Sequence, residues 1–197
     1  MFDIALIILG YLIGSISSAI IVCRAFGLPD PRTGGSNNPG ATNVLRIGGK
    51  TPAAVTLAGD WAKGTIPVLI ALWLGDNAAV VAATGLAAFF GHLYPVFFRF
   101  QGGKGVATGL GVLLAWSPSV LALAALTWIV VAGAFRYSSL AAMAAFAMAP
   151  AYVFWLLGDP VIAVATAVMA IAVVWRHRTN IVRLATGEES RIGQPKP

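Results

Sequence analysis

Residues 4–23 read IALIILGYLIGSISSAIIVC, a stretch without a charge that ends at Arg24. A helix of about 20 apolar residues is long enough to cross the hydrocarbon core of a bilayer. Gly10 and Gly14 have the GxxxG spacing that permits close contact with a second helix. No basic region precedes the stretch and no small-residue cleavage pattern follows it. We therefore expect a retained membrane span.

The composition extends this interpretation to the whole chain. Of the 197 residues, 58% are hydrophobic and 10% are charged, and the mean hydropathy is +0.84. Soluble domains carry about 25% charged residues. We predict an all-α integral membrane protein that forms a single membrane-embedded domain over residues 1–197, and we expect neither a metal nor a nucleic-acid partner. The lone Cys23 excludes an intramolecular disulfide.

Further apolar stretches lie at residues 51–74, 78–98, 138–157 and 161–175. Residues between Lys104 and Arg136 carry no charge, and SPS at 117–119 predicts a break there because Pro118 cannot continue a helix. The chain then has seven spans, and its basic loops share one side of the membrane while Asp3, Asp76 and Asp159 lie on the other. The positive-inside rule favours this arrangement over six spans.

The predicted topology is therefore seven transmembrane helices with a short broken pair at 104–136. The N-terminus lies outside and the C-terminus in the cytoplasm. The first half of the broken pair has only about 12 residues, which is short for a full crossing, so a tilted, buried or re-entrant helix is an alternative.

Two glycine-rich stretches, GGSNNPGATNVLRIGG (34–49) and FQGGKGVATG (100–109), lie on the predicted cytoplasmic side together with WRHRTNIVRL (175–184). Glycines allow successive N–H groups to point inward, and a helix that begins directly afterwards adds its positive dipole end. This pattern predicts an anion site that includes Lys104 and Thr108. Neither stretch matches the nucleotide-binding P-loop, because Lys104 is followed by Gly105 and GGKT at 48–51 lacks the leading glycine.

The first glycine-rich stretch is dense in polar groups. Hydroxyl, amide and guanidinium groups come from Ser36, Asn37, Asn38, Asn43 and Arg46, and Pro39–Gly40 favours a turn. The planar arginine fork suits phosphate. The alternative is a solvated loop in which Asn and Gly serve only the turn geometry.

Four segments together carry a family resemblance: GYLIGSISSAIIVCR (10–24), GLPDPRTGGSNNPGATNVLRIGGK (27–50), GHLYPVFFRFQGGKGVATG (91–109) and HRTNIVRL (177–184). In order and approximate spacing, the chain resembles the bacterial acyl-phosphate:glycerol-3-phosphate acyltransferases of the PlsY family, over nearly its whole length. The resemblance implies an enzyme that transfers a fatty acyl group from acyl phosphate to the 1-hydroxyl of glycerol 3-phosphate. It also implies lysophosphatidic acid and inorganic phosphate as products, no cofactor, and a place in the bacterial cytoplasmic (inner) membrane with the site facing the cytoplasm.

The resemblance also assigns residues. It implies catalytic roles for Ser36, Arg46, Lys104, His177 and Asn180, and a structural role for Glu189. Residues that we expect to contact substrate are Asn37, Asn38, Gly40, Asn43, Lys63, Gly102, Gly103, Gly105, Thr108 and Ser139. Two positions depart from the family pattern: Gln101 stands where Lys is common, and Asn37 where Gly is common.

Several roles stay open at this level. His177 is a general base, a hydrogen-bonding partner of a phosphate or helix N-terminus, or a packing residue; the substrate phosphate can also accept the proton. Asp60 and Lys63 either neutralise each other or turn Lys63 into the site. His92 suits packing or a pocket contact better than catalysis. Ser138 and Ser139 can cap the helix that they begin.

Two other functional classes remain as alternatives. An organic-phosphate transporter would have an anion site near the bilayer midplane and internal repeats, but no repeated half is visible in the sequence. An acyl-CoA-dependent acyltransferase would be expected to carry H-x-x-x-x-D, and neither histidine has an Asp at that spacing.

Overall fold

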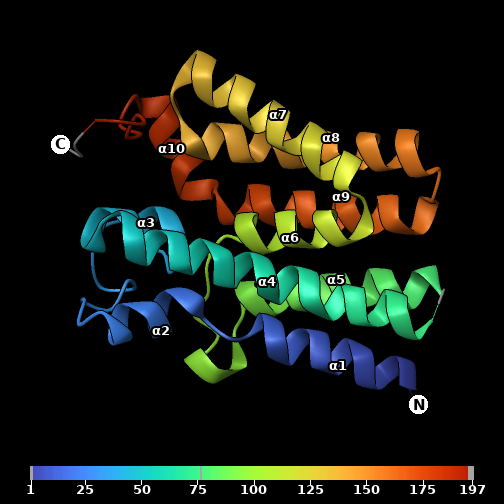
Figure 1. The fold of residues 1–197 in the computed structure, drawn as a ribbon. Coiled ribbons are helices and arrows are strands. Elements are labelled where there is room, and N and C mark those ends of the chain that lie inside the picture. Colours follow the sequence, from blue (N-terminus) through green and yellow to red (C-terminus); the bar gives the residue numbers. More distant parts are fainter. Residues whose placement is uncertain (1, 76, 195–197) are drawn as a thin grey trace. The chain divides into compact units, whose positions relative to one another are not determined.

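A computed structural model of this protein describes residues 2–75 and 77–194. Every regular element within those ranges is a helix (Figure 1). The predicted all-α class is therefore confirmed. The chain divides into two compact units, Met1–Trp116 and Ser117–Pro197. We call them unit 1 and unit 2 and describe each by itself.

In unit 1, α1 (Phe2–Gly14) packs against α5 (Ala78–Leu93) through its two glycines. A Cβ on Gly10 would lie 2.8 Å from the carbonyl oxygen of Thr84, and one on Gly14 would lie 2.7 Å from the Cα of Ala88. No larger residue fits either position without a shift of the backbone. The predicted GxxxG contact is thus present, with α5 as its partner.

The first predicted span is broken. Residues 15–17 separate α1 from α2 (Ser18–Ala25), and the carbonyl oxygen of Ile16 in this break accepts a hydrogen bond of 2.8 Å from Lys63 Nζ. The break was not predicted, and the lysine that bonds to it comes from a helix much later in the chain, α4 (Lys50–Leu74). Asp3–Ala25 together is still long and apolar enough to cross a membrane.

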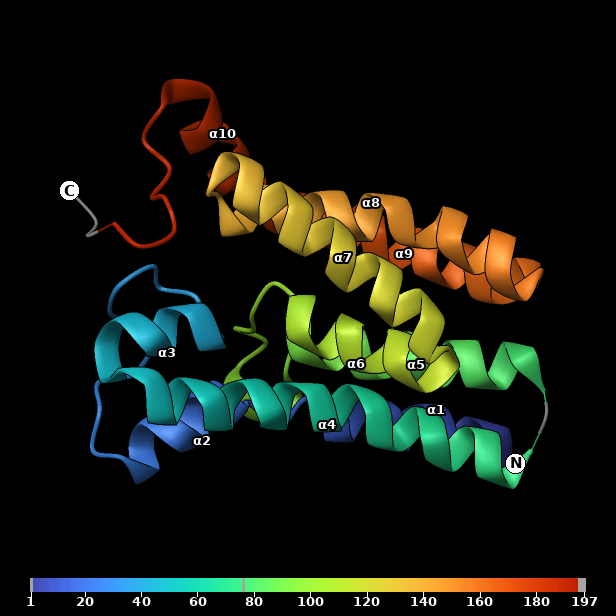
Figure 2. The ribbon, with the colours of Figure 1, turned by 45° about the horizontal axis from the view of Figure 1, so that its top comes forward.

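Other boundaries of unit 1 differ modestly from prediction. Within the predicted polar loop that follows Arg24, a short amphipathic helix, α3 (Ala41–Gly48), packs against α4 with Asn43 and Val44 buried (Figure 2). The span predicted at 78–98 is helical in α5 and ends in a separate short 3₁₀ turn, η1 (Val96–Phe98). After the glycine-rich loop comes α6 (Val106–Trp116).

Unit 2 contains α7 (Pro118–Phe135), α8 (Ser138–Leu157), α9 (Pro160–Arg176) and α10 (Arg178–Thr186). The predicted break at 117–119 is confirmed: Ser117 caps α7 by accepting the N–H of Val120 at 3.3 Å, and Pro118 is its first residue. Helices α9 and α10 meet at His177 with a bend of 54° (Figure 2).

Within the described residues, five segments are long and apolar enough to span a membrane: Asp3–Ala25, Lys50–Leu74, Ala78–Phe98, Pro118–Phe135 and Ser138–Leu157. The bent pair of α9 and α10 is a sixth candidate, and α6 is a shorter apolar helix. The protein is a multi-pass membrane protein. Seven crossings remain a prediction that requires α6 to cross as well.

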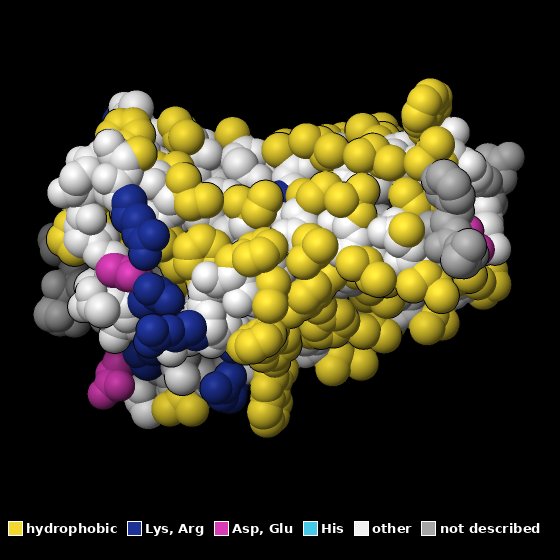
Figure 3. Space-filling model, turned by 90° about the horizontal axis from the view of Figure 1, so that it is seen from below, with side chains coloured by type: hydrophobic (Ala, Val, Ile, Leu, Met, Phe, Trp, Pro, Cys, Tyr) yellow, Lys and Arg dark blue, Asp and Glu magenta, His cyan; other side chains and the backbone are white. Residues whose placement is uncertain are grey.

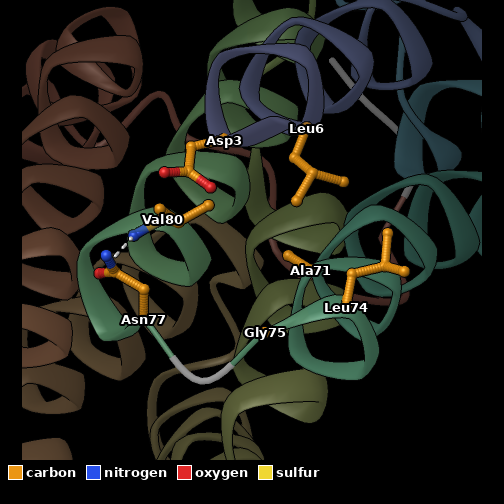
Figure 4. Close-up of a pocket in the computed structure, with 7 residues that line it drawn as sticks. All are labelled: Asp3, Leu6, Ala71, Leu74, Gly75, Asn77 and Val80. Carbon is orange, nitrogen blue, oxygen red and sulfur yellow. Dashed lines mark hydrogen bonds between the residues drawn. The ribbon is translucent and has the colours of Figure 1, made fainter. Parts of the chain in front are cut away.

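The two ends of unit 1 differ in charge. At one end a cavity of ≈ 360 Å³ is lined by Asp3, Leu6, Ala71, Leu74, Gly75, Asn77 and Val80 (Figure 4). The loops that carry Arg32 and Lys104 lie toward the opposite end (Figures 1 and 2). On the face in Figure 3, Lys and Arg side chains gather at one end and most of the rest is hydrophobic. The predicted orientation, with the basic end in the cytoplasm, remains a prediction from the positive-inside rule.

Candidate active site

The two glycine-rich loops meet in unit 1, although residues 50–99 separate the two stretches in the sequence. A Cβ on Gly103 would lie 2.9 Å from the carbonyl oxygen of Pro39. Helix α3 begins directly after the first loop and α6 directly after the second. Two helix N-termini, each with N–H groups that lack a partner within the helix, therefore follow loops that are in contact. The two loops thus lie together as the predicted anion site requires, and anion binding there remains a prediction.

Asn43 shapes the first loop. Its Oδ1 accepts the backbone N–H of Ser36 at 2.8 Å, and its Nδ2 donates to the carbonyl oxygens of Pro31 (2.8 Å) and Gly34 (2.9 Å). The side chain is buried, so these bonds replace water. Asn43 was predicted to contact substrate; the structure gives its amide a role in holding the loop, and substrate contact remains a prediction.

The turn at residues 35–40 depends on left-handed backbone. Gly35 has a φ of 64° and Asn37 a φ of 56°. Asn is the residue after Gly that best tolerates this region, so Asn37 suits the left-handed conformation of this turn. Asn37 is exposed and Asn38 half-buried, and the N–H of Gly40 donates to the carbonyl oxygen of Asn38 at 2.9 Å.

One cation near the first loop is already paired. Arg32 binds Asp30 through two nitrogens, with Nη2 at 2.6 Å from Oδ2 and Nε at 3.0 Å from Oδ1. The hydrogen bonds from Arg32 hold the pKa of the Asp30 carboxyl below its usual range. Arg46 on α3 is exposed and Lys104 is half-buried, so both predicted phosphate-binding cations are within reach of solvent.

The second loop lies on the last turn of α5. The N–H of Gly103 donates to the carbonyl oxygen of His92 at 3.1 Å. A Cβ on Gly102 would lie 2.6 Å from the carbonyl carbon of Leu93, and Gly105, at a φ of 86°, would place one 2.8 Å from Phe89 Cζ. Glycine is thus required at positions 102, 103 and 105 because each approaches α5 closely. At Gly105 the positive φ also requires it. Thr108 is buried where α6 meets Gly64 of α4.

Unit 1 also holds a buried group of charges between α4 and α5. Lys63 Nζ lies 2.8 Å from Asp60 Oδ1, and His92 Nδ1 lies 3.6 Å from the same oxygen. All three side chains are buried. Because Lys63 also bonds Ile16 in the helix break, these contacts favour the neutralising alternative for the Asp60–Lys63 pair. A direct substrate contact for Lys63 remains a prediction.

Unit 2 gathers two predicted residues, Ser139 and Asn180, together with Arg183 around the Glu189 carboxylate. Ser139 Oγ donates to Oε1 at 2.7 Å, Asn180 Nδ2 to the same oxygen at 2.6 Å, and Arg183 Nε to Oε2 at 2.7 Å. Burial acts to raise the pKa of Glu189, but these hydrogen bonds outweigh it and hold the pKa below its usual range. The geometry supports the structural role expected for Glu189.

His177 has a defined tautomer. Its Nδ1 lies 2.8 Å from the carbonyl oxygen of Val173, one turn back in α9. A carbonyl can only accept, so Nδ1 carries a proton and Nε2 holds the lone pair of the neutral ring. The ring is buried at the bend between α9 and α10. Nε2 is therefore the nitrogen that can accept a proton.

The chain after α10 folds back onto the start of α8. Arg136 Nη2 donates to the carbonyl oxygen of Ile192 at 3.0 Å, and the N–H of Ile192 donates to the carbonyl oxygen of Arg136 at 2.7 Å. The expectation that Ser138 or Ser139 caps α8 was wrong. The cap residue is Tyr137, which makes no side-chain cap bond. The Ser139 hydroxyl is bonded to Glu189 instead.

Comparison with known proteins identifies the family. A family model described as glycerol-3-phosphate acyltransferase matches residues 4–187. The glycerol-3-phosphate acyltransferase of Halorhodospira halophila is 68% identical over 193 residues, which cover 98% of both chains. That of Methylococcus capsulatus is 58% identical over 188 residues, with 95% of both chains covered. The chain belongs to the glycerol-3-phosphate acyltransferase family.

Solved structures agree with this assignment. Two crystal structures of PlsY, an integral membrane glycerol 3-phosphate acyltransferase, match 98% of this acyltransferase and 96% of their own chains. The glycerol 3-phosphate form matches with a TM-score of 0.94 at 42% identity. The lysophosphatidic acid form matches with a TM-score of 0.90 at 40% identity. The predicted PlsY resemblance is confirmed, as is the integral membrane fold.

Two features of this acyltransferase escaped prediction from its sequence. The sequence paired Asp60 with Lys63 by their spacing on one helix, but gave no sign that His92 from α5 joins them. Asn43 was also predicted only as one of several polar groups in the first loop. Residue type does not indicate that Asn43 is buried while the neighbouring Leu45 is exposed.

Proposed function

We propose that this family member transfers a fatty acyl group from acyl phosphate to the 1-hydroxyl of glycerol 3-phosphate. The products are lysophosphatidic acid and inorganic phosphate, and the reaction is the first acylation of phospholipid synthesis. The site faces the cytoplasm at the bacterial inner membrane and uses no cofactor. The observation that carries the proposal is the contact of the two glycine-rich loops at Pro39 and Gly103, each followed by a helix N-terminus.

Both substrates carry phosphate, so the protein must hold two anions close together despite their repulsion. Arg46 and Lys104 supply the cations, and the backbone of the loop at residues 102–105 supplies dipoles, apart from the Gly103 N–H, which is bonded to His92. Thr108 and Lys63 complete the predicted contacts together with groups of the first loop. These groups are the side chains of Ser36, Asn37, Asn38 and Asn43 and the backbone of Gly40. Unit 1 therefore provides the phosphate-binding part of the site.

Unit 2 supplies His177, Asn180 and Ser139, which in this proposal face the same substrates. The two units then act as one acyltransferase domain over residues 1–197. Support comes from the family match, which runs through both units from residue 4 to residue 187. The acyl chain of the acyl-phosphate donor remains in the bilayer. The bilayer therefore both dissolves the donor and supplies it to the enzyme.

The reaction needs positioning more than a strong base. The glycerol 3-phosphate hydroxyl oxygen attacks the acyl carbonyl carbon; an ester C–O bond forms, and the bond between that carbon and the phosphate oxygen breaks. Inorganic phosphate leaves with the bonding electron pair. Phosphate is already a good leaving group, so holding the hydroxyl in place and stabilising the developing oxyanion supply most of the acceleration.

The hydroxyl proton goes to His177 Nε2 or to a substrate phosphate. The bond from His177 Nδ1 to Val173 favours Nε2 as an acceptor, since it fixes the neutral tautomer. His177→Ala separates the two routes. Near-normal turnover at saturating substrate would remove His177 from the chemistry and leave the phosphate as acceptor.

Assay of the purified protein in detergent tests the proposal. Glycerol 3-phosphate is offered with palmitoyl phosphate or with palmitoyl-CoA, and lysophosphatidic acid is measured. We expect product from palmitoyl phosphate alone. Product from palmitoyl-CoA alone would overturn the choice of donor, and uptake of glycerol 3-phosphate into vesicles without acylation would favour the organic-phosphate transporter.

A further inference from the structure

The buried charges of unit 1 reach the glycine-rich loop through one side chain. The His92 imidazole has its Nδ1 3.6 Å from Asp60 Oδ1, and its opposite edge lies against Gly103. A Cβ on Gly103 would overlap His92 Nε2 and lie 3.0 Å from Cε1. The ring therefore lies between a buried carboxylate and the backbone of the loop.

We infer that Asp60 and His92 are positioning residues for the loop at residues 102–105. Asp60 orients the His92 ring, and the ring together with the His92 carbonyl oxygen holds Gly103 at the place where it meets Pro39. The inference rests on the proposed function in one respect: it takes this loop to bind the phosphate of glycerol 3-phosphate.

The contacts form a continuous series through unit 1. The carbonyl oxygen of Ile16, in the break between α1 and α2, accepts from Lys63; Lys63 pairs with Asp60; and Asp60 faces His92. The backbone N–H of Gly103 then donates to the His92 carbonyl oxygen at 3.1 Å. His92 thus holds Gly103 through both its main chain and its side chain. Asp60 on α4 in turn faces the imidazole ring of His92.

Neutralisation of Lys63 accounts for Asp60 on α4 but not for His92. An ion pair lets a charged helix insert into the membrane, and the Asp60–Lys63 pair meets that need at 2.8 Å. A third polar side chain placed against the same carboxylate, buried and in contact with the loop, needs a further reason. Orientation of the imidazole by a carboxylate, a common support for functional histidines, supplies it.

The tests separate binding of glycerol 3-phosphate from binding of the donor. The Kd for glycerol 3-phosphate is measured by calorimetry on the purified protein, and the KM for each substrate and kcat are measured with palmitoyl phosphate. For His92→Ala we expect the Kd and KM for glycerol 3-phosphate to rise about tenfold, while the KM for palmitoyl phosphate changes by less than about twofold. If His92→Ala does not fold, His92→Gln takes its place, with a smaller rise expected.

Asp60 is tested together with its partner, because removing one charge alone would leave the other buried and unpaired. The double variant Asp60→Leu with Lys63→Met replaces both by apolar side chains of similar size. We expect it to fold and to show the same selective rise in the Kd for glycerol 3-phosphate. Because Asp60 acts through His92, the double variant in the His92→Ala background should raise the Kd no further than Lys63→Met alone does in that background.

Thr84→Ala is the matched control, since Thr84 is buried on the same helix but faces α1. We expect its Kd for glycerol 3-phosphate to stay at the wild-type value. The inference is overturned if the His92 variants keep wild-type Kd, if the KM for both substrates rises equally, or if, with His92→Ala present, the double variant raises the Kd further than Lys63→Met alone does. Wild-type protein that binds glycerol 3-phosphate but does not use palmitoyl phosphate would refute the proposed donor and leave the Kd test valid.

Discussion

Pro39 and Gly103, from two loops far apart in the sequence, are in contact: a Cβ on Gly103 would lie 2.9 Å from the Pro39 carbonyl oxygen. Neither loop has to move for the two to form one surface. The N-termini of α3 and α6 follow these loops directly. This contact makes the phosphate-binding part of the proposed site a property of unit 1 alone.

Gly103→Ala should therefore damage binding more than folding. The added methyl meets the Pro39 carbonyl oxygen and the His92 ring, so the loop must shift. We expect at least about a tenfold rise in the KM for glycerol 3-phosphate, equivalent to about 1.4 kcal/mol. The control is Gly133→Ala in α7, where a Cβ would meet nothing within 4 Å. Equal kinetics for both variants would contradict this account of the loop contact.

At position 37 the backbone conformation sets the requirement. Asn37 has a φ of 56°, which glycine adopts freely and a β-branched residue does not. We expect Asn37→Gly to keep the thermal midpoint of the wild type. Asn37→Val should lose about 1–2 kcal/mol of stability and much of the activity. A valine variant as stable and active as the glycine variant would show that the left-handed turn is not needed.

The Glu189 cluster predicts a dependence of stability on pH. The folded-state pKa of Glu189 lies below its ordinary value of 4.5, so the charged carboxylate stabilises the fold above that pH. This stabilisation is lost as the pH falls through the folded-state pKa. Glu189→Gln, which weakens charge-assisted hydrogen bonds, should cost about 1–3 kcal/mol near neutral pH.

Thermal unfolding of wild type and Glu189→Gln across a pH series measures this effect. The difference between their midpoints should shrink as the pH falls below 4.5. A difference that stays constant down to about pH 3 would mean that the Glu189 charge is not what Ser139, Asn180 and Arg183 recognise.

Gly14 in α1 offers a test of the fold itself. A Cβ there would lie 2.7 Å from the Cα of Ala88, and helix backbones cannot yield at that distance. Gly14→Leu should separate α1 from α5 and lower the thermal midpoint by several degrees or prevent folding. The control is Ile16→Leu, at a nearby exposed position in the helix break. Comparable thermal midpoints for Gly14→Leu and Ile16→Leu would argue against the glycine contact.

The sequence predicted those parts of the fold that depend on local pattern. Uncharged stretches marked the spans, and Ser117–Pro118 marked the break before α7 because cap and proline chemistry is local. The break at Ile16 was missed, and the side chain that bonds its carbonyl oxygen, Lys63, lies 47 positions away. A hydrogen bond of that kind leaves no periodic signal in either segment.

The candidate site shows the same division. Residue types and glycine spacing were enough to predict an anion site around Lys104 and the first loop, and the two loops do meet. What pattern cannot give is which polar groups are used internally. Asn43 and Ser139 were both expected at substrate, and in the structure they also hold the loop and the Glu189 cluster together.

We propose that the loop at residues 102–105 and the segment at residues 177–180 both face the cytoplasmic side of the membrane. Labelling of single cysteines tests it most directly, with Gln101→Cys beside the glycine-rich loop and Thr179→Cys beside His177; both native side chains are exposed. A membrane-impermeant maleimide is applied to right-side-out and to inverted vesicles, with Cys23, which is buried, replaced by Ser. We predict that both cysteines react only in inverted vesicles. Labelling of the two positions from opposite sides of the membrane would contradict a shared site.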